Sequence, residues 1–255
     1  MLSCSIGKVM KIELIDYQVH ALELLLLTKS TRLKGATLAE IIAMSEYEKL
    51  DHYAYMKDTI KSSFEFCHYI FQLSGVSRAF TQQLERTRTQ SYAEQSLRAV
   101  DVRNSPVYNF GLCDDYDSAV TNSMAAYEKM VDSGIAIQDA RGVLPIDITT
   151  NIIVGTNLRT LHETAKVRLC YRTQGEYQNV FKEMRRLIGE AHPWALDMIN
   201  VACVDSGVCC FPRYTECPIQ EYTVKISDFK KMAIKIAWEN TNHEANPIAK
   251  NGVTQ

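Results

Sequence analysis

Residues 86–98 gather side chains that could bind an anion. They read Arg-Thr-Arg-Thr-Gln-Ser-Tyr-Ala-Glu-Gln-Ser-Leu-Arg, with three arginines and two serines. Arginine stays charged at any working pH, and its planar fork of donors matches phosphate or another planar anion. Serine hydroxyls and backbone amides can complete such a cradle. Composition alone leaves two interpretations open, an anion site and a solvated charged loop.

The spacing of these residues is similar to a family signature. Arg86-x-Arg88, seven further residues and then Ser96 resemble the R-H-R-x7-S signature of the flavin-dependent thymidylate synthases (the ThyX family), with Thr87 in place of the histidine. Further blocks follow the family's order and spacing over about residues 60–190. They are Ser63-Phe64-Glu65, Gly75-Val76-Ser77-Arg78-Ala79 with Gln83, Asp139-Ala140-Arg141-Gly142-Val143-Leu144-Pro145, Asn157-Leu158-Arg159, and Arg168-Leu169-Cys170-x3-Gln174-x-Glu176.

The resemblance implies an enzyme, a flavin-dependent uridylate C5-methyltransferase. The expected reaction is reductive methylation at C5 of a uridine monophosphate, UMP and/or dUMP. The expected carbon donor is 5,10-methylenetetrahydrofolate, reduced FAD would supply the hydride, and NADPH would recharge the flavin. The protein would mainly position these ligands, because the flavin carries the difficult chemistry. The alternatives are an ordinary dUMP-specific thymidylate synthase and a flavin- or nucleotide-binding paralogue that does not methylate.

The resemblance also implies roles for individual residues. Those expected to contact FAD are Ser63, Arg86, Thr87, Arg88, Glu94, Asn157, Arg159 and Glu163. Those expected to hold the nucleotide are Gln83, Arg86, Glu94, Gln95, Ser96, Leu97, Arg98, Arg141 and Arg168. Arg168 is the expected catalytic residue, because a guanidinium beside the pyrimidine would stabilise negative charge on N3 and the carbonyl oxygens. None of the eight cysteines is needed as a nucleophile.

The chain departs from the family pattern close to these positions. Lys61 and Phe66 stand where two histidines are usual, Thr87 replaces a third, and Ala99 follows Arg98 where an aromatic residue is usual. A hydrophobic pocket only weakly rejects a ligand that adds a hydroxyl, and removing bulk weakens this discrimination further. We therefore expect UMP to be accepted beside or in preference to dUMP, as in the uridylate C5-methylases of nucleoside-antibiotic pathways that resemble this family.

Hydrophobic patterning predicts the elements that would position these residues. Strands are expected over residues 8–17, 64–73 and 147–156, and a helical turn over 139–143. Helices are expected over residues 19–27, 38–45, 47–60, 77–86, 116–133, 157–171, 174–191 and 228–239. Thr37 and Glu40 have capping-box spacing, and Ser77 is a candidate N-cap. With the resemblance, these elements indicate an α+β fold, a central and mostly antiparallel sheet flanked by long helices.

The predicted helix over residues 157–171 bears on the assembly. Arg159 and Arg168 are nine residues apart, which places them on roughly opposite sides of a helix. If both bind ligands, one helix lines two sites, and we expect a homotetramer with shared active sites, as in the resembled family. Two unrelated surface arginines would give the same pattern.

Length and charge bound the remaining expectations. We expect one ThyX-like domain over residues 1–255, with a core over 8–227, a mobile loop over 101–115 and a polar tail over 240–255. The formal net charge of -2 and the pI of about 6.3 argue against a general nucleic-acid or membrane-surface binder. With scattered cysteines, no evident leader and no long apolar run, we expect a cytoplasmic protein.

A cysteine cluster follows the signature blocks. Four thiolates, from Cys203, Cys209, Cys210 and Cys217, could form a closed tetrahedral zinc site. Their spacing does not match a standard pair of C-x2-C knuckles. We therefore favour a chain without a metal site and keep zinc as the alternative.

Overall fold

The computed structural model describes residues 10–29, 35–59, 61–108, 111–211, 217–219, 224–225 and 232. The chain forms two compact units, Met1–Ile199 and Asn200–Gln255. The extent of the ThyX-like domain stays a prediction. Apart from residue 232, the predicted helix over 228–239 and the polar tail over 240–255 lie outside the described residues.

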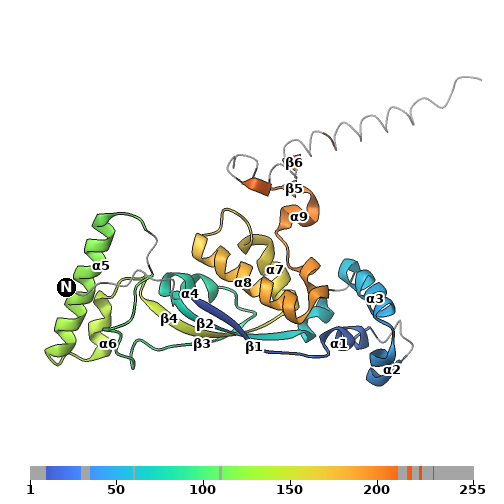
Figure 1. The fold of residues 1–255 in the computed structure, drawn as a ribbon, viewed down its shortest axis with the longest axis horizontal. Coiled ribbons are helices and arrows are strands. Elements are labelled where there is room, and N and C mark those ends of the chain that lie inside the picture. The colour runs from blue at the N-terminus through green and yellow to red at the C-terminus, as the bar shows by residue number, and fades with distance from the viewer. Residues whose placement is uncertain are drawn as a thin grey trace, which may run out of the picture. The chain divides into compact units, whose positions relative to one another are not determined.

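A four-stranded antiparallel sheet forms the centre of the first unit, in the order β1-β2-β4-β3 (Figure 1). Its strands are β1 (Lys11–Tyr17), β2 (His68–Ser77), β3 (Ser91–Glu94) and β4 (Thr149–Asn157). β2 and β4 pair along their whole length, from His68↔Asn157 to Ser77↔Thr149. Alternate residues of this pair are buried in the main core, including Tyr69, Phe71, Leu73, Ile152 and Val154. The α+β prediction with a mostly antiparallel sheet is confirmed.

Helices α7 (Leu158–Arg168) and α8 (Gly175–Ala191) lie over one face of the sheet (Figure 1). The other helices of this unit are α1 (Ala21–Leu27), α2 (Leu38–Ala43), α3 (Glu46–Thr59), α4 (Arg78–Leu84), α5 (Asp114–Asp132) and α6 (Ile137–Ala140), with short 3-10 turns η1 (Ser62–Phe66), η2 (Arg141–Val143) and η3 (Pro193–Met198). The predicted capping box is present, because Thr37 and Glu40 exchange their two bonds at the start of α2.

The second unit contains α9 (Ala202–Ser206) and a parallel pair of two-residue strands, β5 (Val208–Cys209) and β6 (Val224–Lys225). In neither unit does the described part of the chain include a helix long and apolar enough to cross a membrane.

Two expectations around the central strands are wrong. The strand expected from residue 64 begins at His68, because Ser62–Phe66 forms η1 and buries Phe64 in the core. It also continues past Gly75 to Ser77, through a register shift between Ser74 and Val76. Gly75 has a φ of 67°, a conformation that glycine adopts without a steric cost. The strand β3 was not predicted at all, since its four residues were assigned to a loop.

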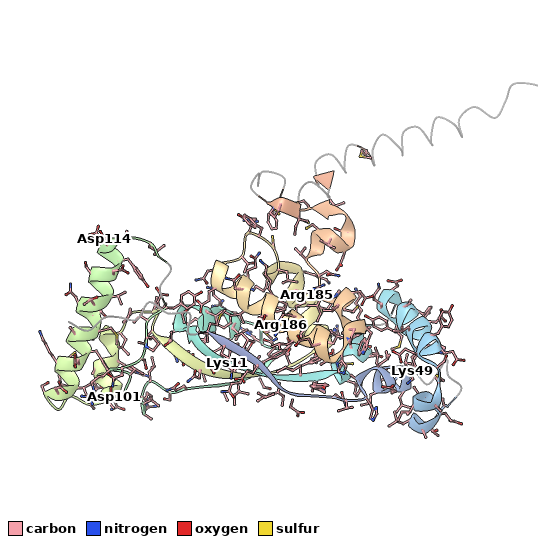
Figure 2. The ribbon with its side chains drawn as sticks, viewed as in Figure 1. Lys11, Lys49, Asp101, Asp114, Arg185 and Arg186 are labelled. Atoms are coloured by element: carbon pink, nitrogen blue, oxygen red, sulfur yellow. The ribbon has the colours of Figure 1, made fainter. Side chains whose placement is uncertain are left out.

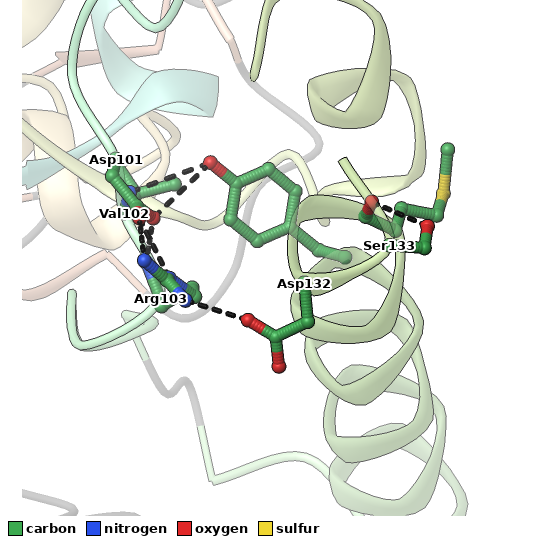
Figure 3. Close-up of polar contacts among 7 residues, drawn as sticks. Asp101, Val102, Arg103, Asp132 and Ser133 are labelled. Carbon is green, nitrogen blue, oxygen red and sulfur yellow. Dashed lines mark hydrogen bonds and ion pairs between the residues drawn. The ribbon is translucent and has the colours of Figure 1, made fainter. Parts of the chain in front are cut away.

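A second, smaller core joins the loop after β3 to α5 and α6. It buries Val102, Tyr127, Ala140 and Ile148. The loop is tied to α5 because the Arg103 guanidinium binds Asp101 at 2.6 Å and Asp132 at 2.8 Å (Figure 3). We call the buried cluster of Val102, Tyr127, Ala140 and Ile148 the α5–α6 core. The predicted mobility of residues 101–115 stays a prediction.

A buried carboxylate joins α8 to the start of α4. Glu176, in the first turn of α8, is 1% exposed. It accepts hydrogen bonds from the Ser77 amide at 2.7 Å and from the Ser77 hydroxyl at 2.6 Å. Ser77 Oγ in turn accepts from the Phe80 amide at 3.0 Å, which confirms Ser77 as an N-cap. Burial raises the pKa of Glu176, and the bonds from Ser77 offset this in part.

The raised pKa of Glu176 predicts the sign of a pH effect. The folded state holds the proton more tightly than the unfolded state, so the contribution of Glu176 to stability is greatest at low pH and falls as the pH rises through the folded pKa. Glu176→Gln removes this titration. The free energy of unfolding of wild type minus that of Glu176→Gln should therefore fall as the pH rises from about 4.5, the ordinary pKa of a glutamate, through the raised pKa of Glu176.

Urea unfolding of both proteins across this range measures the difference. Glu190→Gln serves as the control for removing one carboxylate from the same helix, because Glu190 is exposed near the end of α8. A difference that grows with pH would contradict the prediction.

Candidate functional site

A cavity of about 760 Å³ lies where β4 ends and α7 begins. Its volume falls in the range of about 300–1,000 Å³ that is usual for small-molecule and cofactor sites. Its lining combines two guanidinium groups, two carboxylates and several hydroxyls. The lining residues are Glu65, Thr87, Thr89, Asn157, Arg159, Thr160, Glu163, Thr164, Val167 and Arg168.

The cap of α7 and the helix periodicity direct one face of this helix to the cavity. Asn157 Oδ1 accepts a hydrogen bond from the Thr160 amide at 2.9 Å, which caps the helix. The cavity residues Thr160, Glu163, Thr164 and Val167 then recur at intervals of three and four, the spacing of one helical face. Residues on the other side of α7, Leu158, Leu161 and Ala165, are buried in the main core.

Arg159 and Arg168 line this same cavity. The expectation that two arginines on opposite sides of the helix cannot serve one compact pocket is therefore wrong. Nine residues separate them by roughly 14 Å along the helix axis. Arg168 shares the cavity face with Thr160 and Thr164. Arg159 lies in the first turn, where its long side chain reaches Glu65, with Nη1 and Oε1 2.5 Å apart.

The start of the signature loop also reaches the cavity, through Thr87 and Thr89. The Thr160 hydroxyl donates to the Thr89 hydroxyl at 3.1 Å. The Tyr92 hydroxyl lies within hydrogen-bond distance of two carbonyl oxygens, that of Leu84 at the end of α4 at 2.7 Å and that of Thr87 in the loop at 2.9 Å. Tyr92 was not among the predicted site residues, although it is the one aromatic residue in residues 86–98.

Charged groups hold the cavity residue Glu163 in place. Lys166 Nζ donates to both oxygens of Glu163, at 2.8 and 2.9 Å. These bonds are the main cause that lowers the pKa of Glu163, so this carboxyl is ionised at neutral pH. Behind it, Lys61 Nζ lies 3.2 Å from Nε2 of the buried His162. In the sequence, Lys61 stands out only because the family usually has a histidine at this position, and Lys166 does not stand out at all. The contacts of both lysines become visible only in the fold.

The strand β3 carries the signature loop away from the cavity. It pairs antiparallel with β4, from Ser91↔Gly155 to Glu94↔Ile152. The Gln95 amide then donates to the Asn151 carbonyl at 2.9 Å. Asn151 and Asn157 are six positions apart along β4, a span of roughly 20 Å. The residues that follow Gln95 therefore leave β4 at the end opposite to the cavity.

Ten of the fifteen predicted site residues thus fall into two groups. The cavity group comprises Thr87, Asn157, Arg159, Glu163 and Arg168. The second group lies near the α5–α6 core, where Leu97 packs against the cluster that contains Ala140, the residue before Arg141. This distal group comprises Gln95, Ser96, Leu97, Arg98 and Arg141.

The other predicted residues do not line the cavity. Ser63 is buried, Gln83 donates a hydrogen bond to Gln174, and Glu94 is paired with Arg78 at 2.7 Å. Burial raises the pKa of Glu94, and hydrogen bonding and the Arg78 charge oppose this rise. The side chains of Arg86, Arg88, Arg98 and Arg141 are exposed, and no carboxylate among the described residues forms an ion pair with them.

The cysteines are not arranged as a metal site in the part of the chain that the structure describes. No group of three or more His, Cys, Asp or Glu side chains there could hold a metal ion. The zinc alternative for Cys203, Cys209, Cys210 and Cys217 therefore gains no support. Burial raises the pKa of the Cys67 thiol to about 12, which leaves it protonated and a poor nucleophile.

The known proteins that resemble this chain in sequence point to one family. The family model described as "Thymidylate synthase complementing protein" matches residues 14–194. The flavin-dependent thymidylate synthase of Geobacter sulfurreducens is 34% identical over 158 residues, which cover 58% of this chain and 68% of that protein. The enzyme of the same name from Pyrococcus abyssi is 29% identical over 182 residues, covering 61% and 74%. The match to the Sulfurisphaera tokodaii enzyme, 29% identical over 150 residues, spans 56% of this chain and 58% of the relative.

A solved structure has a similar fold. It is the crystal structure of a UMP/dUMP methylase, PolB from Streptomyces cacaoi, bound with 5-Br dUMP. The TM-score is 0.62 at 19% sequence identity, over 74% of this chain and 94% of that chain. At this identity the similarity supports the fold alone. The family match covers well over half of the sequence and contains the whole cavity, so the chain belongs to the thymidylate synthase complementing protein family, the flavin-dependent thymidylate synthases.

Proposed function

We propose that this enzyme methylates uridylate at C5, with a reduced flavin as hydride source and methylenetetrahydrofolate as carbon donor. The observation that carries the proposal is the cavity, in which Thr87, at the histidine position of the signature loop, and the expected catalytic residue Arg168 line one space. The guanidinium of Arg168 would stabilise the negative charge that develops on the pyrimidine, without a covalent bond to the enzyme. The high pKa of the buried Cys67 agrees with a reaction that needs no thiolate.

The cavity residues fit a flavin adenine dinucleotide. Arg159, Asn157 and the threonines offer cationic and hydroxyl donors for an anionic pyrophosphate and for carbonyl oxygens, in a cavity of about 760 Å³. When bound, the reduced flavin supplies the hydride, and NADPH is the proposed reductant that restores it. The chain's own residues then orient the nucleotide against the flavin and hold the charge that forms on the pyrimidine.

We further propose that the active site is shared between copies of the chain in a homotetramer. The cavity group and the distal group lie at opposite ends of β4, roughly 20 Å apart, so they do not converge within one chain. Arg168 of the cavity group and all members of the distal group match nucleotide-binding positions of the family. A closed symmetric oligomer can place the distal group of one copy beside the cavity group of another.

Flavin binding should depend on Arg159. Arg159→Ala removes a charge-assisted contact worth about 1.5–3 kcal/mol, which corresponds to flavin binding that is roughly ten- to a hundredfold weaker. The visible flavin absorbance per protein after purification and the dissociation constant from titration of the apoprotein with FAD measure the loss.

The matched control is Arg186→Ala. Arg186 lies on α8 (Figure 2), is exposed, and is likewise ion-paired, to Glu183 and Glu190. It does not line the cavity. Equal flavin occupancy in Arg159→Ala and Arg186→Ala would contradict a flavin at this cavity.

The second prediction concerns the sugar. Ala99 is exposed and small beside Arg98, so little bulk is available there to reject the ribose 2′-hydroxyl. We expect kcat/KM for UMP and dUMP to lie within about a hundredfold of each other, or to favour UMP. Formation of the 5-methylated nucleotide from each substrate, with saturating methylenetetrahydrofolate and NADPH, gives both constants.

Three results of this assay separate the alternatives. A preference for dUMP of roughly a thousandfold or more would indicate an ordinary dUMP-specific thymidylate synthase. Bound flavin without methylation of either nucleotide would indicate a paralogue with other chemistry. Omission of methylenetetrahydrofolate should abolish product, and product without it would refute the proposed carbon donor.

Sharing of the active site predicts complementation between two inactive variants. Arg98→Ala removes one arginine of the distal group and Arg168→Ala removes the expected catalytic arginine of the cavity group, so each variant alone should have little activity. If the two arginines of one site come from different chains, random mixed oligomers contain both in about a quarter of their sites. Mixing by reversible dissociation, or by co-expression with two affinity tags, should then restore activity.

Absence of any recovery in verified mixed oligomers would show that both arginines come from one chain. A monomeric wild type in light scattering that still methylates uridylate would also refute sharing. Mixing Arg98→Ala with Arg141→Ala is the matched control, because both residues belong to the distal group.

A further inference from the structure

The guanidinium of Arg168 is held against the face of an aromatic ring. Its Cζ atom lies 4.3 Å from the centroid of the Tyr177 ring. Arg168 is the last residue of α7, and Tyr177 lies in the first two turns of α8, so the turn between the helices sets this contact. Among the described residues, no carboxylate forms an ion pair with Arg168.

The ring itself has a fixed position. Tyr177 is 0% exposed and belongs to the main core. Phe80 of α4 packs against it edge to face, with ring centroids 4.9 Å apart and planes at 84°. Burial raises the pKa of the Tyr177 hydroxyl, while neighbouring Arg168 and Thr87 lower it. Tyr177 thus holds a fixed place against Arg168, which lines the cavity.

An aromatic face holds a guanidinium in a different way from a carboxylate. A bidentate carboxylate occupies the in-plane N–H donors of arginine, whereas a ring face attracts the cation through its quadrupole and leaves those donors available. It also adds no negative charge that would offset the stabilisation of an anionic pyrimidine. The Tyr177 ring therefore suits an arginine whose donors and charge are needed by a ligand.

We propose that Tyr177 is a positioning residue for Arg168, fixing the guanidinium at the cavity so that its N–H groups and its charge are directed to the pyrimidine. This inference rests on the proposed uridylate methylation. It assigns a task to a buried residue that the signature blocks do not include. The part of Tyr177 that performs this task is the ring face, and the hydroxyl is dispensable.

The test compares Tyr177→Phe with Tyr177→Leu. Phenylalanine keeps the ring face, so kcat for uridylate methylation should stay within about twofold of wild type, whereas leucine removes the face and should lower kcat by roughly tenfold. Flavin occupancy and the unfolding temperature are recorded for each variant. Tyr177→Met, which keeps more side-chain length, replaces Tyr177→Leu if the latter does not fold.

A double-mutant cycle distinguishes positioning from a general role in packing. In the Arg168→Ala background, Tyr177→Leu should cause little further loss in single-turnover methylation, because the group that the ring positions is already absent. An equal loss in both backgrounds, a Tyr177→Phe variant as impaired as Tyr177→Leu, or wild-type kcat in Tyr177→Leu would overturn the inference. If wild type itself methylates neither UMP nor dUMP, the proposed function fails, and the role of Tyr177 in it falls with it.

Discussion

The pairing of β2 with β4 determines where the functional groups can lie. Each strand ends at the N-cap of a helix, β2 at Ser77 for α4 and β4 at Asn157 for α7. Because the strands are antiparallel, from His68↔Asn157 to Ser77↔Thr149, the two helices begin at opposite ends of the sheet. α4 then carries the chain towards the cavity, and β3 carries it back along β4. A slip of one residue would turn the buried side chains to the other face and displace both caps.

Local signals in the sequence predicted most elements of this frame, because they depend on neighbouring residues. The capping box at Thr37 and the N-cap at Ser77 are such signals. The 3-10 turn at Ser62–Phe66 and the short strand β3 were missed because tertiary contacts determine them. The alternation of residues 64–73 fits a strand, yet burial of Phe64 is achieved from a turn instead.

The site was predictable only through family resemblance, and the arrangement of its residues was not. Angular spacing on a helix placed Arg159 and Arg168 on opposite sides, but that estimate ignores the reach of an arginine in the first turn of a helix. Likewise, the division into a cavity group and a distal group follows from strand register, which the sequence of residues 86–98 does not reveal. Tyr92 and Tyr177 belong to no motif, because their contacts arise only in the fold: Tyr92 binds the carbonyl oxygens of Leu84 and Thr87, and the Tyr177 ring contacts Arg168.

The ion pairs of the cavity explain why its two arginines differ in how readily they can bind a ligand. Arg159 is paired with Glu65, and Glu163 with Lys166, so of the two guanidinium groups only that of Arg168 lacks an ion pair with a described carboxylate. The side chains of Arg159 and Glu65 are 45% and 55% exposed, and such an exposed pair is worth only about 0–1 kcal/mol. A hydrogen bond to a charged ligand group contributes about 1.5–3 kcal/mol. An anionic ligand can therefore displace Glu65 from Arg159 at little cost, while Arg168 needs no displacement at all. The cavity can thus bind one anionic group at Arg168 without breaking an ion pair. A second anionic group can bind at Arg159 once the pair with Glu65 opens.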